Sequence, residues 1–104
     1  MNEEQRQYMV VIHADAEQML YTHVQFLANV SISAAQKLRD TLFNAFASLE
    51  YLPHRCPIYQ TRRASGTYRR LITGRYQIIF SVDDEEGSVS IRYVLDSRQD
   101  NNDF

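Results

Sequence analysis

Three short apolar stretches in the second half of the chain alternate with two turn signals. They cover residues 67–72, 76–82 and 88–95. Each is rich in the β-branched and aromatic residues that strands favour. Thr73-Gly74 separates the first two stretches, and an acidic run ending in Gly87 separates the last two. Because turns this short join neighbouring antiparallel strands, the sequence predicts a three-stranded meander.

Two amphipathic stretches precede the meander. Over residues 14–28 the apolar side chains recur three and four positions apart, which is typical of a helix with one buried stripe. A second stripe follows Ser33, whose spacing to Gln36 matches a capping box, and continues to Leu52 before Pro53. Two helices joined by a short connection should form an antiparallel hairpin, and its apolar face needs a sheet to cover.

The first ordered segment should be a strand over residues 7–13, with apolar side chains on both of its sides. That pattern predicts a strand in the interior of the sheet. The 104 residues contain no repeat or linker, so we expect a single domain over residues 1–104. The predicted fold class is α+β with the order β-α-α-β-β-β. Its helix hairpin would pack on a small, twisted, mainly antiparallel sheet of four strands.

The formal charges divide the chain into a basic middle and acidic ends. Between Tyr51 and Val82 every charged side chain is positive, and these are Arg55, Arg62, Arg63, Arg69, Arg70 and Arg75. The net charge of −2 argues against indiscriminate binding of nucleic acid. We expect Arg70, Arg75 and Arg98 to form one basic surface, on which a polyanion would show a log-log salt slope of roughly −2 to −3. The alternative is that each guanidinium is solvated or paired with a nearby carboxylate.

Other features argue against a metal site and a membrane location. The three histidines are scattered, and the lone Cys56 gives no zinc pattern, so we expect neither a metal nor a cofactor. Cys56 is more typical of a small buried thiol than of a nucleophile. The polar amino terminus lacks the apolar core of a signal peptide, and no stretch is apolar enough for a membrane helix. We therefore expect a cytoplasmic protein that does not bind membranes.

Particular residues add a family resemblance over nearly the whole chain. The second helix closes on Leu-Glu-Tyr-Leu-Pro, the first strands of the meander begin Tyr-Arg-Arg-Leu-Ile-Thr-Gly-Arg, and the last strand ends in Val-Leu-Asp-Ser-Arg-Gln-Asp. In this order they resemble the RelE/ParE superfamily of type II toxin-antitoxin systems, which includes plasmid stabilisation proteins. The resemblance implies a bacterial toxin that inhibits growth and is neutralised by a cognate antitoxin. It also implies contact with operator DNA only through the antitoxin complex, and it leaves open whether the toxin is a homodimer.

Two mechanisms occur in that superfamily. Its ParE-like branch poisons DNA gyrase by binding, whereas its RelE-like branch cleaves messenger RNA on the ribosome without a metal. The ribonuclease pattern surrounds the phosphate with a basic residue, two arginines and a tyrosine. At the matching positions this sequence has Arg70, Gln77, Arg98 and Phe104. Two of the four residue types are therefore retained.

Metal-free cleavage of RNA needs groups that take up and release protons, as well as cations around the phosphate. No histidine follows His54 and no lysine follows Lys37, so the cationic residues of the meander are all arginines, which are poor proton carriers. The candidate catalytic residues are therefore Arg70, Arg98 and His54, together with the hydroxyl of a nearby tyrosine. The candidate contacts to a target or to nucleic acid are Arg62, Arg63, Arg69, Arg75 and Tyr76. We favour a ParE-like binding toxin; a RelE-like endoribonuclease and a degenerate toxin that only binds its antitoxin are the alternatives.

Overall fold

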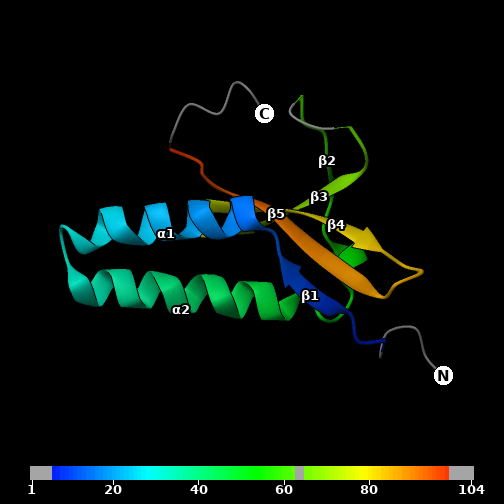
Figure 1. Cartoon of the computed structure of the whole chain (residues 1–104), viewed down its shortest axis with the longest axis horizontal. Coiled ribbons are helices and arrows are strands. Elements are labelled where there is room, and N and C mark those ends of the chain that lie inside the picture. Colours follow the sequence, from blue (N-terminus) through cyan, green and yellow to red (C-terminus); the bar gives the residue numbers. More distant parts are fainter. Residues whose placement is uncertain (1–5, 63–64, 99–104) are drawn as a thin grey trace.

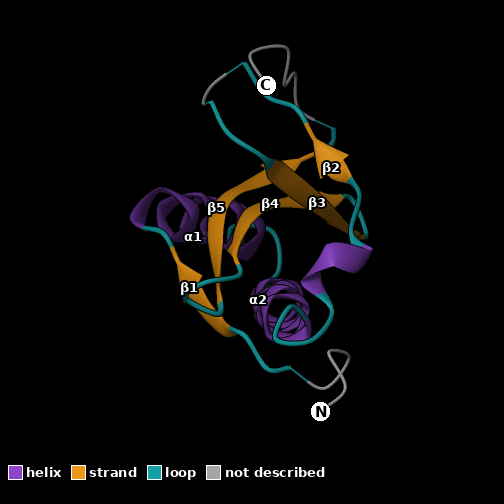
Figure 2. Cartoon of the chain, turned by 90° about the vertical axis from the view of Figure 1, so that its right-hand side faces the viewer, coloured by secondary structure: helices purple, strands orange, loops and turns teal. Residues whose placement is uncertain are grey.

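The computed structural model of the chain describes residues 6–62 and 65–98. Within them, two α-helices pack on one face of a five-stranded sheet (Figures 1 and 2). The elements are β1 (Met9–Ile12), α1 (Ala14–Ala28), α2 (Ile32–Ser48), the 3-10 helix η2 (Pro53–Arg55), β2 (Ile58–Tyr59), β3 (Tyr68–Thr73), β4 (Tyr76–Asp83) and β5 (Ser88–Asp96). The predicted α+β class is confirmed. The fifth strand, β2, is a two-residue segment in the connection that follows α2.

The strand order is β1-β5-β4-β3-β2. The predicted meander is present, because β4 pairs antiparallel with both β3 and β5. Gly74 and Gly87 occupy its two turns with φ of 59° and 67°, a region that glycine enters without steric cost. The β4–β5 register shifts between Ile79 and Phe80, which pair with Tyr93 and Ile91. The sheet is mixed, because β1 pairs in parallel with β5.

The prediction that the first strand lies in the sheet interior is wrong. β1 is an edge strand, bonded to β5 on one side only within the described part of the chain. Met9 is 69% exposed and Val11 is also exposed, whereas Val10 and Ile12 pack against the core beneath the helices. Apolar residues on both sides of a strand suggested burial on both sides, but the helix hairpin covers only one face.

The helix hairpin agrees with the expected pattern but differs at its ends. α1 has the predicted bounds, and His13 caps it by accepting a hydrogen bond from the Asp15 amide. α2 begins two residues earlier than a cap at Ser33 would place it, because Ser31 is its cap and accepts from the Ala34 amide at 3.2 Å. α2 also ends at Ser48, so Leu52 lies beyond the helix, exposed and with a left-handed φ of 50°.

The main core lies between the hairpin and the sheet. Its largest fully buried side chains come from α1 (Leu20), from α2 and its end (Leu42, Leu49), from β4 (Ile78, Phe80) and from β5 (Val89, Ile91, Val94). The opposite side of the sheet, which we call the helix-free face because the helix hairpin does not cover it, has a smaller buried cluster made by Tyr68, Ile79, Tyr93 and Leu95. Met19 of α1 and Tyr59 also pack against this cluster.

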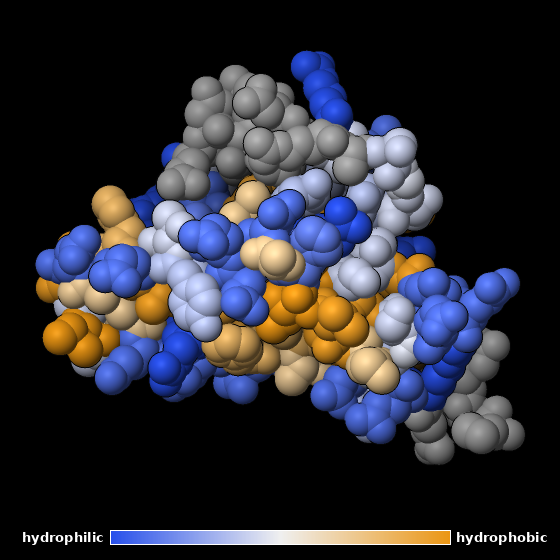
Figure 3. Space-filling model, in the orientation of Figure 1, coloured by the Kyte–Doolittle hydropathy of each residue, from blue (hydrophilic) through white to orange (hydrophobic). Residues whose placement is uncertain are grey.

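The hairpin extends past the sheet, so its turn lies far from the strands (Figure 1). Hydrophobic residues gather at this free end (Figure 3), where Val30 and Ile32 are exposed. None of the described helices is both long enough and apolar enough to cross a membrane.

Candidate functional site

Arg70, on β3, lies on the helix-free face. It pairs with Ile79 across β3 and β4, so both side chains leave the sheet on that side. Its Nη1 donates a hydrogen bond to Gln77 Oε1 at 3.2 Å, and its guanidinium carbon lies 5.2 Å from the centre of the Tyr59 ring. Its Nε is buried without a hydrogen-bond partner among the described residues. Arg70 and Gln77 are therefore neighbours. They stand at the two positions of the ribonuclease pattern that lie on the first two strands of the meander.

Phenol side chains surround this pair. Tyr68 and Tyr93 belong to the buried cluster of the helix-free face, and the Tyr68 hydroxyl donates to the carbonyl oxygen of Ser65 at 3.4 Å. A cation, an amide and phenols can hold an anion. None of them is an imidazole, a carboxylate or a lysine, the groups that most often move protons in catalysis.

Arg75 and Arg98 lie on the other side of the sheet, next to α1. Both flank the buried carboxylate of Asp96, with nitrogen-oxygen distances of 3.6 and 3.7 Å. Arg75 also donates to the Tyr76 hydroxyl at 3.2 Å, and the Tyr76 ring packs edge-on against His23 at 5.2 Å between ring centres. The structure therefore does not bring Arg70, Arg75 and Arg98 together on one surface. Tyr76 is buried rather than presented to a target.

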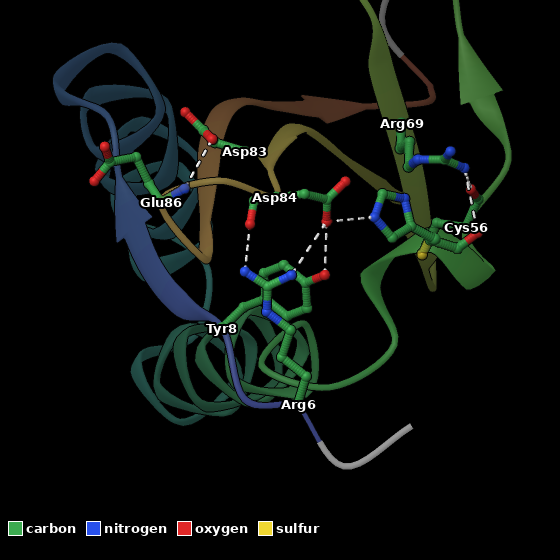
Figure 4. Close-up of polar contacts among 8 residues, drawn as sticks. Arg6, Tyr8, Cys56, Arg69, Asp83, Asp84 and Glu86 are labelled. Atoms are coloured by element: carbon green, nitrogen blue, oxygen red, sulfur yellow. Dashed lines mark hydrogen bonds and ion pairs between the residues drawn. The ribbon is translucent and has the colours of Figure 1, made fainter. Parts of the chain in front are cut away.

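Two further arginines bond to the backbone. Arg69 Nη1 donates to the carbonyl oxygens of Cys56 at 2.6 Å and His54 at 3.2 Å, which ties β3 to the preceding connection (Figure 4). Arg55 Nη1 donates to the carbonyl oxygen of Ser48, the last residue of α2, at 3.4 Å. It also donates to the carbonyl oxygens of Tyr51 at 2.7 Å and Leu52 at 3.0 Å, which lie beyond the helix. These guanidiniums stabilise the connection, because they satisfy carbonyls that helix and strand leave unpaired.

His54 belongs to a polar cluster on the helix side, which we call the Asp84 cluster. The Asp84 carboxylate accepts hydrogen bonds from Tyr8 Oη at 2.7 Å and His54 Nε2 at 2.9 Å (Figure 4). Arg6 Nη1 lies 4.0 Å from the same carboxylate oxygen, and its other terminal nitrogen bonds to the Asp84 carbonyl oxygen. These hydrogen bonds, that of His54 first, hold the pKa of Asp84 below its usual value of 3.8. His54 is therefore on the opposite side of the sheet from Arg70.

The sequence did not identify the Asp84 cluster. In the sequence Asp84 is one member of the acidic run before Gly87, and nothing local links it to Tyr8, 76 positions earlier. The run of four acids was visible in the sequence, but which residues bond to Asp84 depends on the tertiary structure.

Cys56 and Arg62 are the remaining candidate residues that the structure describes. Cys56 is buried, and burial raises the pKa of its thiol more than the neighbouring Arg55 and Arg69 lower it, which disfavours a nucleophilic role. Arg62 is exposed. Arg63 and Phe104 lie outside the described residues. Among the residues that are described, no three His, Cys, Asp or Glu side chains are grouped so that they could hold a metal ion.

Comparison with known proteins agrees with this architecture. The chain is similar in fold to the RelBE2 toxin-antitoxin complex of Mycobacterium tuberculosis, with a TM-score of 0.64, 21% identity, and coverage of 91% of this chain and 97% of that chain. It is also similar to the archaeal RelE-RelB complex of Pyrococcus horikoshii OT3, with a TM-score of 0.59, 17% identity, and coverage of 90% and 99%. No curated protein matches. The sequence model described as the ParE toxin of type II toxin-antitoxin system, parDE, matches residues 10–101. Because that match spans most of the sequence, the chain belongs to the ParE toxin family within the RelE/ParE superfamily.

Proposed function

We propose that this toxin inhibits growth by binding an essential target, DNA gyrase, and not by cleaving RNA. The observation that carries the proposal is the chemistry of the helix-free face. There Arg70 bonds to Gln77 and stacks on Tyr59, and the described residues around them include no imidazole, carboxylate or lysine. Cleavage of RNA without a metal would need such a group to move protons.

The imidazole nearest in sequence supports the same proposal. His54 binds Asp84 on the helix side of the sheet, and Arg98 pairs with Asp96 on that side too. The three candidate catalytic residues are thus divided between two faces, so no single phosphate could contact all of them in this conformation. Arg70, and Arg62 on the adjoining connection, are the arginines that we assign to target contact.

A cognate antitoxin is the second partner that we propose. The support comes from the family and from the two similar structures, both of which are toxin-antitoxin complexes. Operator DNA would be bound through that complex, because the toxin itself has a net charge of −2. The proposed encounter with gyrase takes place in the cytoplasm.

A pair of parallel assays tests the mechanism. Purified toxin should inhibit the supercoiling of relaxed plasmid by gyrase, and it should leave the messenger RNA of translating ribosomes intact. Arg70→Ala should weaken gyrase inhibition about tenfold, the effect expected for the loss of a charged hydrogen bond. Arg39→Ala on the exposed side of α2 is the matched control. Full gyrase activity in the presence of folded toxin would contradict the proposal.

A RelE-like endoribonuclease is the second candidate. It is favoured by the contact between Arg70 and Gln77, which places the first two positions of the ribonuclease pattern side by side next to phenol groups. In that case codon-specific mRNA ends would appear with the wild-type protein and disappear with Arg70→Ala. Inactivity in both assays, with no growth arrest on expression, would instead identify a degenerate toxin.

A further inference from the structure

We propose that a groove along α1 is a docking site for an acidic segment of a protein partner, with a carboxylate held between Arg75 and Arg98 and an apolar side chain on Phe26. The site, which we call the α1 groove, consists of a hollow of about 410 Å³ and a shallow stretch of the α1 surface that adjoins it, which share Thr22 and Phe26. The first is also lined by His23, Arg75, Tyr76, Asp96 and Arg98, and the second by Gln18, Tyr21, Gln25 and Asn29.

The hollow is the basic end of the groove. Among the residues that the structure describes, its two guanidiniums flank one carboxylate, so Arg75, Arg98 and Asp96 together carry a net charge of +1. Their separations from Asp96, 3.6 and 3.7 Å, exceed the 2.7–2.9 Å that is typical of a charge-assisted hydrogen bond. Two guanidiniums have ten N–H groups, more than one carboxylate can accept. Arg75 and Arg98 therefore have N–H groups that Asp96 does not occupy and that an incoming carboxylate can accept from.

Arg75 is also preorganised for this role. Its guanidinium carbon lies 5.3 Å from the centre of the Tyr76 ring, and its Nη2 donates to the Tyr76 hydroxyl. Tyr76 is buried against His23, whose Nε2 bonds to the Val94 carbonyl oxygen at 2.8 Å. A side chain that is already oriented loses less conformational entropy when it binds a ligand.

The adjoining stretch of α1 offers an apolar and an amide surface. Phe26 is 70% exposed, a large fraction for a phenylalanine, and Tyr21 beside it is exposed as well. The side-chain amides of Gln18, Gln25 and Asn29 can donate to and accept from a peptide backbone. The groove therefore matches an extended peptide with one acidic and one apolar side chain.

The charge of the groove favours a peptide over nucleic acid. A phosphodiester chain binds through several cations spaced along its length. Here Arg75 and Arg98 meet at one end, share Asp96, and give way along α1 to uncharged side chains. The α1 groove is on the helix side of the sheet, away from Arg70. This inference therefore goes beyond the proposed function and does not depend on gyrase as the target.

The test is an NMR titration of the full-length ¹⁵N-labelled protein with two blocked synthetic pentapeptides, Ala-Glu-Ala-Leu-Ala and Ala-Gln-Ala-Leu-Ala. The glutamate peptide should shift the amides of Thr22 and Phe26 and should bind about tenfold more tightly than the glutamine peptide, as expected for a hydrogen bond between charged groups. Raising the salt concentration should reduce that preference. Equal affinity for the two peptides would overturn the proposal.

Two surface variants separate the parts of the groove without disturbing the core. Arg98→Gln, at a side chain 61% exposed, should remove most of the preference for glutamate, and Phe26→Ala should weaken both peptides by a similar factor. Arg39→Gln, at an exposed side chain of α2, is the control and should change neither. Unchanged peptide selectivity in a folded Arg98→Gln protein would contradict the assignment. So would tighter binding of an oligothymidylate than of the glutamate peptide at the same amides.

Discussion

Asp84 joins three distant segments of the chain through one carboxylate. Tyr8 precedes β1, His54 lies in η2, and both donate to an acid in the turn between β4 and β5. Each of these hydrogen bonds favours the ionised form of Asp84, which explains why its pKa is lowered. At the residue scale, one acid of the turn between β4 and β5 thus contributes to the tertiary structure.

Asp84→Asn should therefore destabilise the protein near neutral pH but not in acid. Because the pKa of Asp84 is lower in the folded state, its carboxylate stabilises the protein above the usual value of 3.8, and that contribution disappears as the pH falls through the folded value. Urea midpoints at pH about 6 and about 2.5 measure the effect. The gap between wild type and variant should close at the lower pH. A gap of constant size, or an equal effect of Asp40→Asn on α2, would contradict the assignment.

Substitution of Asp96 should lower the stability more than substitution of Asp84, because the Asp96 side chain is only 8% exposed. Asp96→Ala would remove the carboxylate that Arg75 and Arg98 share and the acceptor of the Arg98 amide, and it should cost about 1–3 kcal/mol of unfolding free energy. Arg98→Ala removes an exposed member of the same group and should cost less than about 1 kcal/mol. Urea denaturation of the two variants measures both values. Equal losses would show that exposure does not control the strength of these pairs.

At the scale of elements, the connection between α2 and β3 is held by arginines that bond to carbonyls. Arg55 satisfies the end of α2, Arg69 returns from β3 to the segment around Cys56, and β2 adds a short edge to the sheet. Residues that looked like part of a basic surface are therefore used to order a loop. Loops of this length seldom keep one conformation without such contacts.

Arg55→Ala should consequently destabilise the protein by about 1–2 kcal/mol, because several hydrogen bonds at the end of α2 are lost together. Arg62→Ala is the matched control from the same connection. Its side chain is exposed, so its effect should stay within about 0.5 kcal/mol. Thermal and urea unfolding of both variants test the contrast. A similar loss for the two arginines would refute the capping role of Arg55.

At the scale of the whole molecule, the cations are dispersed. Arg70 is on the helix-free face, Arg75 and Arg98 share Asp96 beside α1, and Arg55 and Arg69 bond to backbone carbonyls. No large positive field results from these described side chains in a protein of net charge −2. Weak and unspecific attraction to nucleic acid is the expected consequence.

Binding of a single-stranded oligonucleotide to the isolated toxin should therefore have a log-log salt slope shallower than about −2, because Arg70, Arg75 and Arg98 do not converge on one surface. Arg70→Ala should reduce the magnitude of the slope by up to about one. Fluorescence anisotropy over a range of salt concentrations provides the measurement, with Arg39→Ala as the control. A slope of about −2 to −3 would instead indicate three convergent cations, as the sequence alone suggested.

The fold was largely readable from the sequence because its signals are local. Apolar spacing placed α1 at its observed bounds, and glycine turns placed the strands of the meander within a residue of their observed ends. The family could be identified from the same segments. The edge position of β1 could not be predicted, because which faces of a strand are covered depends on elements far away in the chain.

The candidate site depended much more on tertiary structure. The sequence placed Arg70, Arg75 and Arg98 in one basic region, but strand alternation and the position of Asp96 separate them onto two sides of the sheet. The same holds for His54, whose partner Asp84 is 30 positions away. The sequence by itself determined the helices, the meander and the kinship, since these follow from contacts between near neighbours. Only the tertiary structure decided which guanidiniums remain available to a partner, because ion pairs and hydrogen bonds form between whichever groups the packed core brings within reach.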